Sequence, residues 1–220
     1  MILDTRYHTF ETPEPVRTQL REALSEIDAE NYAEAERILE RSLSEHSSES
    51  QTPDLKVFPT LSIYLAIARA RGKDTEAGAE VIRDAIDTIA KVAPEDRAQR
   101  PRLIGVLLWL LEDDSGDIQQ ALEIAGKAVE QFVDTTDDGE PPTNLYLEDV
   151  HLIYGELLLK DGQSTRAQEV LSRVTARAEH AFRHNRPFAA ASEEGKWMSY
   201  TLWAIIQDAK KLIAKAESAQ

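Results

Sequence analysis

The feature that most constrains this chain is a pair of apolar stripes joined by a very short turn, between Leu145 and Phe182. In each half, apolar side chains recur every three or four residues, the spacing that places them on one face of an α-helix. They are Leu147, Val150, Tyr154, Leu157 and Leu158, then Ala167, Val170, Leu171, Val174, Ala178, Ala181 and Phe182. Gly162 can adopt the positive φ that ends the first helix, and Ser164 can cap the second. The two helices are therefore expected to fold back on each other as an antiparallel hairpin.

The same alternation of helical stripes and short turns continues along the chain, and no stretch shows the alternating pattern of a strand. We predict about nine antiparallel helices, arranged as four hairpins and one closing helix. Each hairpin has a small residue early in its second helix: Ala35, Ala77 (or Ala79), Ala121 and Ala167. By subtraction these alanines lie 42, 44 and 46 residues apart, and a recurring period of this size indicates a stack of helical repeats.

The pattern predicts three regions. Residues 1–12 form an N-terminal arm, residues 13–183 the hairpin repeats, and residues 184–220 a turn followed by a C-terminal capping helix. The turn is expected over residues 184–189, and polar loops are expected over residues 44–53 and 134–144. The helix at 102–112 is apolar on nearly every side, so it is expected to be buried or to lie against a partner.

Charge and composition limit the partners. The net charge is −15 and the pI about 4.8, which disfavours nucleic acid because binding it requires a surplus of Lys and Arg. A basic or apolar partner fits this charge better, although the charge can also serve solubility alone. The chain lacks cysteine, its N-terminus does not resemble a signal peptide, and its longest apolar run, Leu103–Leu111, is too short to span a bilayer. We expect a cytoplasmic protein without membrane insertion.

Several stretches resemble the tetratricopeptide repeat (TPR) family. Gly155, Leu158, Ala167 and Leu171 stand at the mutual spacing of the family's Gly, aromatic, Ala and apolar positions. Asn31–Ala35 with Leu39 and Ser42, and Gly116–Ala121 with Ala125 and Ala128, resemble its turn and second-helix signature. The resemblance implies a TPR-like right-handed solenoid whose concave face, lined by the first helices of the hairpins, binds peptides or partner proteins. It implies no chemistry, and the period is longer than the family's usual length.

Candidate partner-binding residues follow from the resemblance and from the distribution of charge. Placed by analogy on the concave face are Arg17, Arg21, Tyr64 and Arg69. A basic stripe on the last hairpin contains Arg173 and Arg177, with Arg166, His180 and His184, and could dock a carboxylate-rich partner or be a solvated face. Trp109 and Trp203, with Tyr146, Trp197 and Tyr200, could be exposed anchors for a partner or part of the core.

No catalytic or cofactor-binding motif is present in the sequence. His180 and His184 lie one helical turn apart, but His151 would be roughly 10 Å from His180 along the hairpin, so we predict no metal site. The leading hypothesis is a non-enzymatic interaction or scaffold module that binds a protein or peptide or assembles into a homo-oligomer. The alternative is a small-molecule sensor or enzyme with a pocket inside a compact helical bundle.

Overall fold

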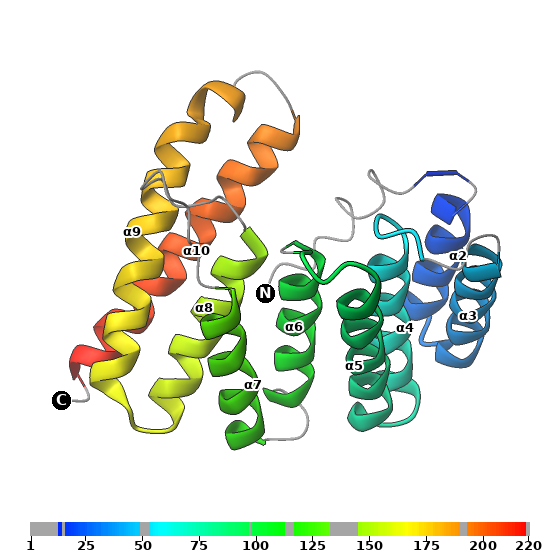
Figure 1. Ribbon diagram of the computed structural model, residues 1–220, viewed down its shortest axis with the longest axis horizontal. Coiled ribbons are helices and arrows are strands. Elements are labelled where there is room, and N and C mark those ends of the chain that lie inside the picture. The colour runs from blue at the N-terminus through cyan, green and yellow to red at the C-terminus, as the bar shows by residue number, and fades with distance from the viewer. Residues whose placement is uncertain are drawn as a thin grey trace. The chain divides into compact units, whose positions relative to one another are not determined.

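The computed structural model is all-helical. It describes residues 13–14, 16–48, 53–96, 98–112, 117–132, 145–189 and 193–218. Within these ranges the chain forms nine α-helices and no strand, which confirms the predicted fold class (Figure 1). The predicted N-terminal arm and the loop at 134–144 lie outside the described residues. None of the described helices combines the length and the apolar character that crossing a membrane requires.

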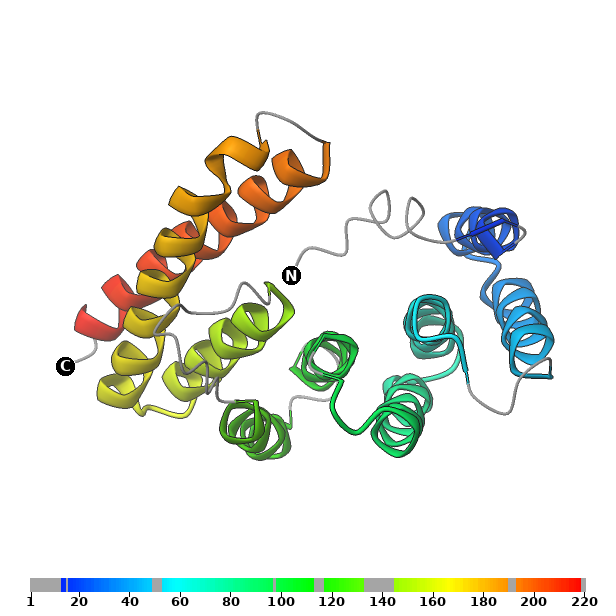
Figure 2. The same ribbon diagram turned by 45° about the horizontal axis from the view of Figure 1, so that its top comes forward.

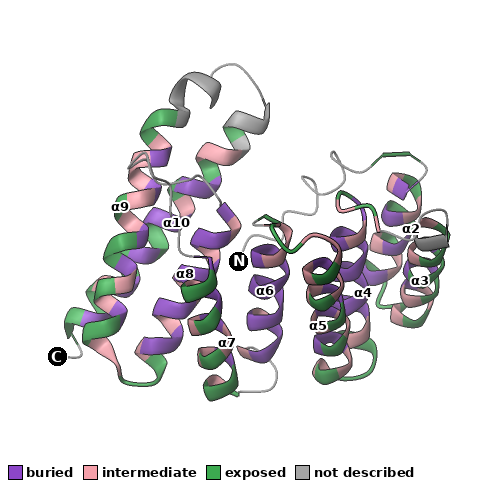
Figure 3. Ribbon diagram, viewed as in Figure 1, coloured by how far each residue is buried: buried purple, intermediate pink, exposed green. Residues whose placement is uncertain are grey.

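The chain divides into two compact units, Met1–Gly116 and Asp117–Gln220. The described part of the first unit contains α2 (Val16–Asp28), α3 (Tyr32–Ser48), α4 (Phe58–Gly72), α5 (Thr75–Val92) and α6 (Gln99–Leu110). Helices that follow one another in sequence pack together, and α4 also contacts α2 and α6. Figure 2 views α4, α5 and α6 nearly along their axes and shows them side by side. Because α2, α3, α5 and α6 all contact α4, every residue from 59 to 68 is buried (Figure 3).

The second unit contains, in its described part, α7 (Ile118–Gln131), α8 (Leu145–Lys160), α9 (Ser164–Ala189) and α10 (Glu193–Ser218). α8 contacts α7, α9 and α10, and α9 and α10 run side by side as the two longest helices (Figure 1). The predicted hairpin of α8 and α9 is confirmed. The hairpin expected from residues 102–112 and 117–132 would join the two units, and that pairing stays a prediction.

The turn between α8 and α9 is set by its glycine. Gly162 has a φ of +79°, as expected from the sequence. The Gln163 amide donates to the Leu158 carbonyl at 2.8 Å, and the Gly162 amide donates to the Leu159 carbonyl at 3.1 Å. This pair of bonds is a Schellman motif, which satisfies carbonyl groups that the end of α8 would otherwise leave unpaired. Ser164, predicted as the cap, is instead the first residue of α9.

The turn between α2 and α3 has the same hydrogen bonds without a glycine. Glu30 has a φ of +61°, its amide donates to the Ile27 carbonyl, and the Asn31 amide donates to the Glu26 carbonyl at 2.8 Å. A residue with a Cβ is strained in this left-handed region. The geometry of the turn thus overrides the local preference of Glu30.

Small residues let paired helices approach closely, as the repeat predicted. Four of the alanines at the recurring position are completely buried: Ala35, Ala79, Ala121 and Ala167. Of the two candidates in the second hairpin, Ala79 is the buried one and Ala77 is half-buried. A Cβ on Gly78 would lie 2.6 Å from the Ala66 carbonyl oxygen, and a Cβ on Gly155 would lie 2.5 Å from Leu171 Cδ2. Glycine is therefore required where α5 meets the α4 backbone, and at Gly155 a side chain would force Leu171 of α9 to move.

The turn predicted at residues 184–189 is wrong, because α9 continues through them to Ala189. Pro187 removes one backbone hydrogen bond and usually breaks a helix interior. Here α10 packs along α9, and that packing outweighs the local preference of the proline. The boundary predicted between residues 183 and 184 therefore falls inside a helix. The loop predicted from residue 44 likewise begins later, because α3 continues to Ser48.

Candidate interaction surface

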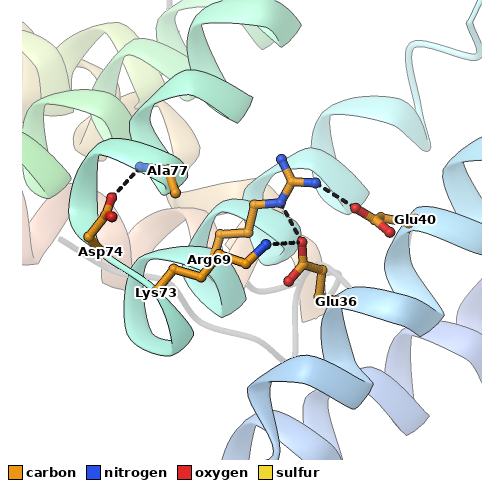
Figure 4. Close-up of polar contacts among 6 residues, drawn as sticks. All are labelled: Glu36, Glu40, Arg69, Lys73, Asp74 and Ala77. Atoms are coloured by element: carbon orange, nitrogen blue, oxygen red, sulfur yellow. Dashed lines mark hydrogen bonds and ion pairs between the residues drawn. The ribbon is translucent and has the colours of Figure 1, made fainter.

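Arg69, one of the arginines predicted to line an open groove, is held inside the first unit (Figure 4). Its Nε donates to Glu36 Oε1 at 2.8 Å and its Nη2 donates to Glu40, both on α3. Lys73 Nζ donates to the same Glu36 oxygen at 2.7 Å. Burial acts to raise the pKa of Glu36, but the hydrogen bonds from Lys73 and Arg69 outweigh it, so the pKa is lowered overall. The Arg69 charge is thus matched by two carboxylates of the preceding hairpin.

Arg17 and Arg21 lie one turn apart on α2. Arg17 Nε is 3.9 Å from Glu14 Oε1, so the Arg17 charge is also balanced within the chain. Arg21 is exposed, and its assignment to a partner surface stays a prediction.

Arg177 is tied to a buried carboxylate on the neighbouring helix. Its Nε donates to Glu148 Oε1 at 2.7 Å and its Nη2 donates to Glu148 Oε2 at 2.9 Å. The Glu148 side chain is only 6% exposed, and a buried carboxylate without a cation is costly. Arg177 therefore has a structural role in joining α8 to α9. Arg173, one turn earlier, is exposed and stays a candidate.

Two titratable groups of α8 have strongly shifted pKa values. His151 is buried and its Nδ1 bonds to the Leu147 carbonyl at 2.8 Å, and this burial lowers the pKa of His151 to about 4. Asp149 is half-buried; this burial, together with the carboxylates of Glu148 and Asp208, raises the pKa of Asp149 to about 7. With its lowered pKa, the His151 imidazole is neutral at physiological pH.

His180 and His184 pack against each other on α9. Their ring centroids are 4.1 Å apart, nearly perpendicular, and His184 Nδ1 bonds to the His180 carbonyl at 2.9 Å. Within the part of the chain that the structure describes, no group of three or more His, Cys, Asp or Glu side chains could hold a metal ion.

Two aromatic residues of the first unit are candidates for different reasons: Tyr64 by analogy on the concave face, and Trp109 as an exposed anchor or part of the core. Tyr64 is 2% exposed on α4, so its side chain is packed inside the first unit. Trp109 is half-buried near the end of α6. The assignments of Tyr64 and Trp109 to a partner surface stay predictions.

Trp203 is exposed, and it has an aromatic neighbour one turn away. Tyr200 and Trp203 on α10 are 60% and 50% exposed, and within the described residues they are the exposed large hydrophobic side chains. Their ring centroids lie 6.2 Å apart with 31° between the planes. Aromatic side chains dominate the energetics of protein interfaces, so two large rings exposed next to each other indicate a contact surface.

The two rings belong to a continuous stripe, which we call the α10 outer face. Its exposed residues are Lys196, Tyr200, Trp203, Gln207, Lys211, Ala214 and Ser218. The opposite side of α10 is buried and contains Thr201, Leu202, Ile205, Ile206, Ala209, Leu212 and Ala216. The stripe itself contains two lysines and no carboxylate, with the exposed Asp208 and Glu217 beside it, in a chain whose net charge is −15. At its edge Lys210 Nζ donates to Glu179 Oε1 on α9 at 2.6 Å.

The exposure of this face can be read from the spacing of the apolar residues in α10. Leu202, Ile205, Ile206, Ala209 and Leu212 follow three-and-four spacing and define the buried side of α10. Tyr200 and Trp203 lie outside that spacing, so they point away from the core.

A concave feature lies in the second unit, between α7, α8 and the start of α9. It is a shallow, open groove lined by side chains of both charges, together with Gly126 and Tyr154. Arg166 lies over the Tyr154 ring, 5.5 Å from its centroid, and Lys127 Nζ donates to Glu123. Of the charged groups that line the groove, Lys127 and Glu123 pair with each other, and Arg166 contacts an aromatic ring.

Comparisons with known proteins bear on the fold. No family model matches the chain, and no curated protein matches it significantly. Among solved structures, BtubC (BKLC) from P. vanneervenii aligns over 94% of this chain and 82% of its own, with 17% identity and a TM-score of 0.58. A Podosopora anserina protein of nearly identical TPR-like repeats aligns over 96% of this chain and 97% of its own, with 20% identity and a TM-score of 0.56. Together with the nine helices and the close-packed alanines, these similarities show that the chain has a TPR-like helical repeat fold.

Proposed function

We propose that the protein is an interaction module and that it binds its partner through the α10 outer face. The observation that carries this proposal is the exposed Tyr200–Trp203 pair, because two adjacent aromatic rings in water are costly unless a partner covers them. Three of the six arginines that could have formed a binding surface, namely Arg17, Arg69 and Arg177, are paired with carboxylates of the same chain.

The role is that of a non-enzymatic scaffold. The TPR-like fold supplies rigid, mutually packed helices, and a fold of this kind supports many roles without dictating one. The features of the second unit agree with a structural function: the buried Glu148 is neutralised by Arg177, and Lys127 and Glu123 at the α7–α8 groove pair with each other.

Site-specific photocrosslinking tests the proposal. A benzophenone amino acid replaces Gln207 at the centre of the α10 outer face, leaving both aromatic residues in place. The matched control places it at Lys215, which is exposed on the same helix but off the stripe. We expect a defined crosslinked species in extract of the source organism from position 207, competed away by unlabelled protein and absent with Trp203→Ala. Equal, non-competable labelling from both positions would refute the proposal.

A further inference from the structure

We infer that the partner of the α10 outer face is a second copy of this chain, packed antiparallel about a two-fold axis through Gln207. This inference rests on the proposed function and names the occupant of that surface. It starts from the spacing of the stripe, which is 4, 3, 4, 4, 3 and 4 residues from Lys196 to Ser218. The spacing reads the same in both directions, with Gln207 at its centre.

A two-fold interface must be self-complementary, because each residue meets the residue that mirrors it across the axis. With the axis at Gln207, Trp203 of one copy meets Lys211 of the other, and Tyr200 meets Ala214. Lys196 meets Ser218, and the two Gln207 side chains meet each other. All seven positions are exposed in the described chain, so the pairing needs no rearrangement of α10.

The chemistry of the facing pairs is favourable. A lysine ammonium over an indole ring is a cation–π pair, and the symmetry forms it twice. Within the described residues Lys211 has no ion pair, whereas its neighbour Lys210 is bonded to Glu179. Ala214 has the smallest side chain of the stripe, and this leaves room for the larger Tyr200 ring. The amide groups of the two Gln207 residues can donate to and accept from each other.

Repulsion between the lysines does not oppose this arrangement. Lys211 lies four residues beyond the axis in each copy, so the two lysines are separated by about 12 Å along the helices. That exceeds the Debye length of about 8 Å at physiological ionic strength, so their repulsion is largely screened. A carboxylate-rich foreign partner would meet the lysines but would offer no cation to the Trp203 ring, whereas a second copy supplies Lys211.

The size of the α10 outer face sets the expected affinity of the dimer. The stripe extends about 33 Å along one helix, and a contact between two such faces is small compared with stable interfaces of roughly 1,600 Å² in total. We therefore expect a dimer with a dissociation constant in the micromolar range. Because each copy carries a charge of −15, raising the salt concentration strengthens this dimer, whereas binding of an acidic partner to the lysines would weaken with salt.

Sedimentation equilibrium on the purified full chain measures the association directly. We expect concentration-dependent dimers for the wild type and loss of dimer for Trp203→Ala. Lys211→Ala should raise the dissociation constant about tenfold, since it removes two cation–π pairs. Lys215→Ala is the matched control and should leave it unchanged. Circular dichroism confirms that each variant is folded. Equal effects at 211 and 215 would overturn the register.

Cysteine crosslinking tests the orientation, because the natural chain contains no cysteine. Gln207→Cys should give disulfide-linked dimers on mild oxidation, and Lys215→Cys should not. A mixture of Lys196→Cys and Ser218→Cys chains should crosslink with a short bismaleimide, while each variant alone should not. Crosslinking of Lys196→Cys with itself would show a parallel pair and refute the inference.

The outcomes separate this inference from the proposed function. A wild-type chain that stays monomeric while position 207 crosslinks to a different protein refutes the second copy and leaves the interaction surface standing. A monomer whose position 207 crosslinks no better than position 215 refutes both. A dimer that Trp203→Ala does not weaken also refutes the inference, because its contact then lies elsewhere.

Discussion

The close approach of α4 and α5 predicts that alanine at Gly78 destabilises the first unit. A Cβ at this position lies 2.6 Å from the Ala66 carbonyl oxygen and 2.8 Å from Ala70 Cβ, whereas ordinary contact begins at 3.4 Å. The carbonyl belongs to the backbone of α4 and cannot rotate away, so the helices must separate by about 0.8 Å. Such overpacking costs about 1–3 kcal/mol, and the higher helix propensity of alanine returns less than about 1 kcal/mol. We expect a net loss of about 1–2 kcal/mol.

Gly126 on α7 supplies a matched control for the same substitution. A Cβ there would lie 3.6 Å from the Tyr154 hydroxyl, which is ordinary contact, so Gly126→Ala should gain up to about 1 kcal/mol. Urea unfolding followed by circular dichroism gives the free energies, and hydrogen exchange of α4 and α5 assigns the Gly78→Ala loss to the first unit. If both substitutions stabilise the chain equally, the close packing of α4 on α5 is refuted.

Three further predictions concern a turn, a buried ion pair and a buried histidine. Glu30→Gly should raise the free energy of unfolding by roughly 0.5–1 kcal/mol, because glycine relieves the positive φ; a loss in thermal or urea melts would contradict this. Arg177→Ala should lower the free energy of unfolding, measured in urea melts, by about 3–5 kcal/mol, because it leaves the Glu148 carboxylate buried and uncompensated. The double variant Glu148→Gln, Arg177→Met should lower it much less. Equal losses for the two variants would count against the bidentate pair. For His151 the folded-state pKa of about 4 lies below the ordinary 6.5, so between pH 6.5 and about pH 4 the unfolded state binds the proton first and the free energy of unfolding falls, by roughly 3 kcal/mol at most. The difference in unfolding free energy between wild type and His151→Gln across this pH range measures this loss. A difference that does not change with pH would refute the burial of His151.

The helical hairpins could be predicted from the sequence because their determinants are local. The three-and-four spacing of apolar residues sets each helix, and Gly162 sets the turn after α8. The N-caps Asp74 and Asp117 begin α5 and α7 through hydrogen bonds to the amides of Ala77 and Gln120. These signals act within a few residues and do not depend on the rest of the fold.

The errors arise where distant packing overrides a local preference. Pro187 predicts a helix end, yet α9 continues past it because α10 lies alongside. Glu30 carries no signal for a positive φ, yet the meeting of α2 and α3 imposes one. Neither outcome can be deduced from the residues next to the site, since the stabilising contacts come from another helix.

The arginines show why the binding surface was harder to predict than the fold. Arg69 and Arg177 look like free cations on a helical stripe, but each is paired with a carboxylate about thirty residues away. Such pairs depend on which helix faces which, and the helical period alone does not specify that. The same period does specify which side of α10 is buried, and Tyr200 and Trp203 lie on the other side. An exposed aromatic pair can therefore be found from sequence once the core stripe of its own helix is drawn first, whereas a charged surface requires knowledge of the neighbouring helices. This asymmetry is the reason that the α10 outer face, rather than the basic stripe of α9, is the stronger candidate for an interface.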